Sequence, residues 1–177
     1  MKHGTGWKTS EMWYVVWTST GSERRAMGAI KNDPLAKRCF IPRRAVQIRK
    51  NGQWIRQEKP LFPGYFFVDT DNAEELSDQV RKIEGFNKLL TVEKEFCPLY
   101  GRDADMIEDL YGKDGLFDLS EGIIEGDRII VTSGPLVGNE GSIRKIDRHK
   151  RLAYLEFDMF GQEVKAAVGL EIIEKHS

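Results

Sequence analysis

The densest run of large apolar residues in the chain lies between Leu61 and Val68 and reads LFPGYFFV. Pro63 cannot donate a backbone hydrogen bond and Gly64 permits a bend, so the pattern predicts a strand that begins at Tyr65. Side chains alternate across a strand, so both faces of this one are apolar. Either both faces are buried within one domain, or one of them is an exposed surface that binds a partner; the pattern leaves both interpretations open.

The stretch before residue 113 predicts further strands and three helices. Trp13 to Thr18 is aromatic and β-branched, which is typical of a strand that could pair with the first one. A shorter strand is predicted over residues 89–92. Apolar residues three and four positions apart predict helices over residues 23–31, 72–83 and 103–111.

Asn51-Gly52 is the strongest hairpin signal in the chain, because a type I′ turn needs positive φ at both central positions. The arms on either side are rich in arginine and lysine, with Trp54 beside the tip. An ordinary solvated hairpin would carry such charges, and so would a nucleic-acid contact. The candidate residues for that contact are Arg43, Arg44, Arg49 and Lys50.

From Gly122 onward the chain consists of short β-branched runs separated by glycines. Helix is disfavoured through so many glycines, and closely spaced strands with turn signals between them predict a small antiparallel β-barrel. The predicted strands cover residues 127–132, 142–146, 151–157, 162–167 and 170–173.

The composition narrows the class of protein. With 177 residues, 40% apolar and 31% charged, the chain is long enough for one sizeable core or two small ones. It shows neither a membrane-spanning run nor a signal peptide, so we expect a cytoplasmic protein without membrane contact. Cys39 and Cys97 lie outside any metal-binding spacing, and neither a metal nor a cofactor is expected. Since His149 is the one histidine away from the ends, an enzyme is not expected either.

Two motifs together resemble the NusG family of transcription elongation factors. The first half carries it through Trp13-Tyr14-Val15-Val16, Phe40-Ile41-Pro42 and Phe62-Pro63-Gly64-Tyr65-Phe66-Phe67-Val68. The second half carries it through Gly126-Asp127-Arg128-Ile129-Ile130-Val131, Gly134-Pro135-Leu136-Val137-Gly138 and Gly141-Ser142-Ile143. The resemblance implies an α+β fold: an N-terminal NusG-type (NGN) antiparallel sheet with helices, followed by a C-terminal KOW domain, an SH3-like small β-barrel. The expected limits are a flexible extension over residues 1–11, the NGN domain over 12–112, a linker over 113–121 and the KOW domain over 122–177.

The resemblance also implies partners. The NGN domain would bind the clamp helices of RNA polymerase through an apolar surface made of Val15, Trp17, Phe62, Pro63, Phe67 and Val92. The KOW domain would recruit another component, with a ribosomal protein left open, and non-template DNA is a further candidate. A monomer is expected.

A basic cluster in the barrel departs from the housekeeping members of the family. It consists of Arg144, Lys145, Arg148, His149, Lys150 and Arg151, with Asp147 inside it. A solvated turn would explain it, and so would phosphate contacts on an RNA leader hairpin. The second interpretation resembles the antiterminator LoaP and predicts a specialised paralog that serves selected operons. A ribosome-associated KOW protein is the alternative of a different class.

Overall fold

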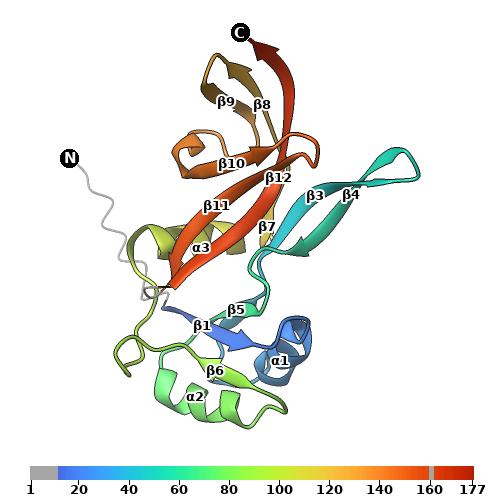
Figure 1. Ribbon diagram of the computed structural model, residues 1–177. Coiled ribbons are helices and arrows are strands. Elements are labelled where there is room, and N and C mark those ends of the chain that lie inside the picture. The colour runs from blue at the N-terminus through green and yellow to red at the C-terminus, as the bar shows by residue number, and fades with distance from the viewer. Residues whose placement is uncertain (1–11, 160–161) are drawn as a thin grey trace, which may run out of the picture. The chain divides into compact units, whose positions relative to one another are not determined.

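The computed structural model describes residues 12–159 and 162–177. The chain forms two compact units (Figure 1). Unit 1 contains residues 12–40 and 64–107, and unit 2 contains residues 41–63 and 108–177. The predicted domain limits stay predictions, but this grouping assigns the basic hairpin to the unit that holds the C-terminal strands. No helix in the described part of the chain is long and apolar enough to cross a membrane.

Unit 1 is built on a four-stranded antiparallel sheet in the order β2-β5-β1-β6. Its strands are β1 (Trp13–Thr18), β2 (Arg38–Phe40), β5 (Tyr65–Asp69) and β6 (Asn87–Leu89). The predicted strands at residues 13–18 and 65–68 are confirmed, and they pair from Trp13 with Asp69 to Trp17 with Tyr65. Phe66, Phe67 and Val68 are fully buried, so both faces of β5 are covered.

The third predicted strand of this unit is displaced. The strand expected at residues 89–92 lies at Asn87–Leu89, where the hydroxyl of Thr18 donates to the Asn87 side chain at 2.8 Å and Leu89 pairs with Val16. Val92 instead forms an isolated bridge with Glu95 around a tight turn. The apolar pattern was right about an extended segment, and its pairing begins at Asn87, opposite Thr18, where the side-chain hydrogen bond lies.

Two helices bury their apolar faces in unit 1. They are α1 (Glu23–Ile30), which buries Ala26 and Ile30, and α2 (Ala73–Arg81), which buries Leu76 and Val80. The side chain of Asn72 caps α2 by accepting from the Glu75 N–H at 3.1 Å. The third helix, α3 (Gly101–Gly112), extends beyond the predicted 103–111 at both ends and contributes residues to both units.

A buried carboxylate fixes the bend that enters β5. Gly64 adopts φ +87°, and its N–H donates to Glu23 at 2.6 Å. The other oxygen of Glu23 accepts from the Gly21 N–H at 2.9 Å. A Cβ at Gly64 would come within 3.1 Å of the Thr18 carbonyl oxygen, so this position favours glycine for its conformation and for its space.

In unit 2, the Asn51-Gly52 turn joins β3 (Arg43–Lys50) to β4 (Gln53–Pro60) as predicted. Both turn residues have positive φ, at +50° and +77°. The short strand β7 (Leu116–Phe117) runs parallel to β3. Part of the segment expected as a linker is therefore regular strand, because Leu116 and Phe117 pair with the hairpin while the Arg43 N–H donates to the Gly115 carbonyl at 2.7 Å.

The C-terminal part of unit 2 is a five-stranded sheet in the order β10-β11-β12-β8-β9. The predicted strands at 162–167 and 170–173 are one strand, which bridges Gly169 and pairs in parallel with β8, an extra strand that the pattern did not predict. Buried residues such as Leu136, Leu155, Val168 and Leu170 form its core. The strands are β8 (Ser120–Glu125), β9 (Arg128–Ser133), β10 (Ile143–Asp147), β11 (Leu152–Met159) and β12 (Gln162–His176), with a 3-10 turn at Glu140–Ser142.

The Glu23 carboxylate should contribute measurably to stability. Replacing Glu23 by Ala leaves the Gly64 N–H without its acceptor inside the fold, and we expect a loss of about 1–3 kcal/mol in the free energy of unfolding. Glu23→Gln keeps one acceptor oxygen and should lose less. Urea unfolding of the three proteins measures this. Equal midpoints for the wild type and the alanine variant would show that the carboxylate is dispensable.

Candidate nucleic-acid interface

A cavity of about 270 Å³ lies in unit 2 between the β3–β4 hairpin and the turn from β10 to β11. Its apolar lining comes from Val46, Ile48, Leu152 and the ring of Trp54. Its basic lining comes from Arg44, Arg49, Lys59, His149 and Lys150. Two basic segments that lie about a hundred residues apart in the sequence therefore line one cavity, here called the basic pocket.

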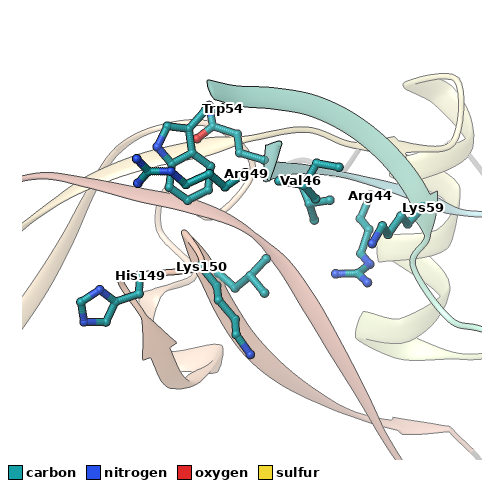
Figure 2. A pocket seen from close by; sticks show the side chains of 10 residues that line it. Arg44, Val46, Arg49, Trp54, Lys59, His149 and Lys150 are labelled. Carbon is teal, nitrogen blue, oxygen red and sulfur yellow. The ribbon is translucent and has the colours of Figure 1, made fainter. Parts of the chain in front are cut away.

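Figure 2 shows how these side chains are arranged. Arg44 and Lys59 lie toward one end of the basic pocket, Arg49 and Trp54 lie toward the other, and His149 and Lys150 come from the turn. The hairpin register explains the first two pairs, because Arg44 is opposite Lys59 and Arg49 is opposite Trp54. Residues directly opposite each other in an antiparallel pair bring their side chains together.

Arg151 joins the turn to the hairpin. Its guanidinium lies 4.1 Å from the centre of the Trp54 ring, within the range of a cation–π interaction. The same group donates to the Gln47 side chain at 2.7 Å and forms an ion pair with Glu171 at 3.2 Å. Arg151 has a φ of +55°, so the end of the turn adopts an unusual backbone conformation at the residue that makes these contacts. We interpret Arg151 as a structural cation.

Arg44 is also held by the protein. Its guanidinium donates to the carbonyl oxygens of Pro60, at 3.2 Å, and of Ala167. Burial lowers the pKa of Arg44, but the ordinary value of arginine is so high that the side chain remains charged at neutral pH. It places a fixed positive charge at the inner end of the basic pocket.

The remaining basic residues of the pocket are exposed. Arg49, Lys59, His149 and Lys150 have no acidic partner among the described residues. Asp147, the acid within the predicted cluster, accepts from the Lys150 backbone N–H at 3.0 Å and so helps to shape the turn. The Lys150 side chain is left available for a ligand.

The six residues of the predicted basic cluster lie at two different cavities. His149 and Lys150 line the basic pocket, and Arg151 supports it. Arg144, Lys145 and Arg148 line a different cavity, in which Arg144 pairs with Glu156 at 3.4 Å.

The four hairpin candidates divide in the same way. Arg44 and Arg49 line the basic pocket, whereas Arg43 pairs with Glu58 and donates to the Asp114 carbonyl at 2.8 Å. Lys50 is exposed at the end of the strand, outside the lining.

Sequence reasoning did not assign Trp54 and Lys59 to the site. Their positions could have been predicted, because a two-residue turn at Asn51-Gly52 fixes which residues of the two strands face each other. Two guanidinium groups lie over the Trp54 ring: the register predicts that of Arg49, at 5.9 Å, but no local pattern predicts that of Arg151, at 4.1 Å.

The residues assigned to polymerase binding differ in exposure. Val15, Phe62 and Phe67 are fully buried, and Phe62 packs edge-on against Phe157 with ring centres 5.3 Å apart. Pro63 is exposed and Val92 is half-buried. The role of all six residues in binding stays a prediction, but only part of the surface is open in this structure.

Within that set, Trp17 is a large aromatic residue with an exposed side chain, and its exposed fraction is 43%. Its ring meets Phe86 edge-on at 5.4 Å, and Phe86 is 59% exposed. Phe86 follows the glycine that ends the α2 region and was not predicted as a site residue. The two rings form an exposed aromatic pair within unit 1.

In the part of the chain that the structure describes, no group of three or more His, Cys, Asp or Glu residues is placed to hold a metal ion. Cys39 and Cys97 are half-buried and unbridged. Burial raises the pKa of the Cys39 thiol, which reduces its reactivity at neutral pH.

Comparison with known proteins shows which family the chain resembles. The family model described as transcription termination factor nusG matches residues 11–108. The transcription termination/antitermination protein NusG of Campylobacter jejuni is 23% identical, over 94% of this chain and 98% of that protein. The protein of the same name from Streptococcus pyogenes is 29% identical, over 89% and 92%. A solved structure on domain interaction in Thermotoga maritima NusG has a TM-score of 0.47 at 24% identity and covers 89% of this chain and 93% of that one.

The family match covers more than half of the chain, and it includes the Trp13–Thr18 strand and the bend before β5. Two units, one an antiparallel sheet with helices and the other a small β-domain, agree with the predicted NGN and KOW fold. The chain belongs to the NusG family of transcription termination and antitermination factors.

Proposed function

We propose that this chain is a NusG-type factor that binds RNA polymerase through its NGN domain and promotes processive elongation or antitermination at selected operons. In this proposal, the basic pocket of unit 2 binds a structured RNA, such as a hairpin in a transcript leader. The observation that carries the RNA assignment is the basic pocket itself, in which exposed Arg49, Lys59 and Lys150 line the same cavity as a tryptophan held in place by Arg151.

The chemistry of the basic pocket favours phosphate contacts. Its exposed cations have no acidic partners among the described residues, so an incoming phosphate would not have to displace an existing ion pair. Trp54 already has a guanidinium 4.1 Å from its ring centre, which leaves less of the ring for stacking on splayed bases. A folded hairpin presents closely spaced phosphates to such a surface, whereas single-stranded non-template DNA would depend more on stacking.

The polymerase assignment is supported by the exposed aromatic pair. Trp17 and Phe86 present a wide apolar surface in unit 1, and tryptophan is enriched among residues that dominate binding energy at protein interfaces. Trp17 belongs to the set that the family resemblance implies, and Phe86 extends it.

Trp17→Asp should weaken binding to RNA polymerase by at least about tenfold, which corresponds to a loss of 1.4 kcal/mol. Because Trp17 is already 43% exposed, the domain should remain folded, in contrast to a charge placed at fully buried Phe62. Affinity for core RNA polymerase, measured by biolayer interferometry, checks this.

Tyr100→Asp is the matched control, because Tyr100 is an aromatic residue that is 83% exposed in the same unit. It should leave polymerase affinity unchanged. Equal affinities for the wild type and a folded Trp17→Asp variant would refute the aromatic site. Co-sedimentation with ribosomes in place of polymerase would favour the ribosome-associated alternative.

Lys150→Glu should weaken binding to a leader hairpin RNA and make that binding less dependent on salt. Each phosphate contact that is lost should reduce the slope of log affinity against log salt by about 1. Fluorescence anisotropy with labelled hairpin RNA at several salt concentrations measures both quantities. Duplex and single-stranded DNA of the same sequence show whether the site prefers RNA.

Lys145→Glu provides a control with the same change of charge, because Lys145 lies in the same predicted cluster but outside the basic pocket. It should retain most of the RNA affinity. If both variants lose affinity equally, the effect reflects the overall charge of the domain and the assignment to the basic pocket is wrong.

A further inference from the structure

The cavity lined by Arg144, Lys145 and Arg148 differs in character from the basic pocket. It has a volume of about 340 Å³, and its floor consists of four half-buried isoleucines, Ile124, Ile129, Ile143 and Ile146. The three basic residues are exposed along its rim, and one acid, Asp127, accompanies them. We call this cavity the isoleucine groove.

The local backbone brings these isoleucines together. Ile124 and Ile129 are direct partners in the β8–β9 ladder. On β10, the register shifts between Ile143 and Lys145, which indicates a bulge. A bulge adds one residue to a strand and re-aims the side chains beyond it, which explains how Ile143 and Ile146, three positions apart, line the same groove.

The two outermost strands of the sheet contribute to the isoleucine groove. β9 and β10 are the ends of the order β10-β11-β12-β8-β9, so in the described ladders each has one edge without a strand partner. The N–H of Val131 on β9 donates to the Glu140 carboxylate at 3.2 Å, whereas Ile129, the residue of β9 that lines the groove, lies two positions earlier. An extended segment placed there has backbone groups to pair with.

We propose that the isoleucine groove binds an extended peptide segment of a protein partner in which apolar and acidic side chains alternate. Alternate side chains of a strand point to opposite sides, so its apolar residues would cover the isoleucine floor while neighbouring carboxylates reach the basic rim. Arg144 is paired with Glu156, but Lys145 and Arg148 outnumber the one acid of the lining, Asp127, and this surplus selects against a basic peptide.

A nucleic acid is a poorer occupant of the isoleucine groove. No aromatic side chain is among its described lining residues, and the neighbouring Tyr154 ring already faces the Lys145 ammonium at 5.8 Å, so bases would find little stacking surface there. Phosphates would lie against aliphatic side chains, and Arg144 is already engaged by Glu156. The basic pocket offers the opposite condition, exposed cations without acidic partners among the described residues, to which phosphates can bind directly.

The test uses a short fluorescein-labelled peptide that alternates valine with aspartate or glutamate, and a second peptide with lysine at the acidic positions. In fluorescence anisotropy with the full chain, the acidic peptide should bind about tenfold more tightly than the basic one or better, since each tenfold step is 1.4 kcal/mol. Equal binding of the two peptides, or no binding of the acidic one, would overturn the proposal.

Two variants assign the binding to the isoleucine groove. Arg148→Glu removes a rim charge at an exposed position, and Ile129→Ser removes part of the floor; each should weaken the acidic peptide severalfold, and circular dichroism verifies that the variants fold. Lys150→Glu is the charge-matched control and should leave peptide binding unchanged. Unaltered peptide affinity in a folded Arg148→Glu variant would refute the site.

The affinity of the variants for hairpin RNA distinguishes the basic pocket from the isoleucine groove. Arg148→Glu should leave RNA affinity close to that of the wild type, so the peptide proposal does not depend on the RNA proposal. If Arg148→Glu instead weakens RNA binding as much as Lys150→Glu and leaves the peptide unaffected, the isoleucine groove is part of the RNA surface and the peptide proposal fails.

Discussion

The contact between Arg151 and Trp54 determines what unit 2 can present to a ligand. The guanidinium lies on the indole ring while it also binds Gln47 and Glu171, so one side chain fixes the hairpin relative to the turn and to β12. Because its charge is balanced by Glu171, Arg151 contributes geometry more than positive potential. The exposed lysines and Arg49 around it supply the potential, and they can do so because their backbones are held in place.

Local rules predicted much of the fold. Runs of aromatic and β-branched residues located β1 and β5, and the Asn51-Gly52 turn fixed the whole register of the hairpin. Contacts between distant segments were not predictable in this way. Nothing near residue 54 indicates that Arg151 will cover its ring, and nothing near Leu116 indicates that it will pair with Arg43. Such contacts depend on how preformed elements dock, which periodicity does not encode.

Exposure was the least predictable property of the candidate sites. The sequence shows that Phe62 and Phe67 are apolar, but a strand with two apolar faces is compatible both with a covered core and with an open surface. In this structure both side chains are fully buried, while Trp17 and its neighbour Phe86 remain exposed. Phe86 was missed because it lies in a short connection with no periodic pattern around it.

The near-zero net charge of the chain conceals how its charges are distributed. Several acids are engaged by neighbouring groups: Glu58 pairs with Arg43 and Arg56, Glu156 with Arg144 and Glu171 with Arg151. Of the cations without such a partner, Arg49, Lys59 and Lys150 lie beside one cavity, and Lys145 and Arg148 lie beside another of similar size, so charge alone does not distinguish the two cavities. The two cavities differ in the uncharged residues that line them. A tryptophan with exposed cations suits a polyanion, whereas an aliphatic floor at the edge of a sheet suits an extended chain whose own side chains alternate.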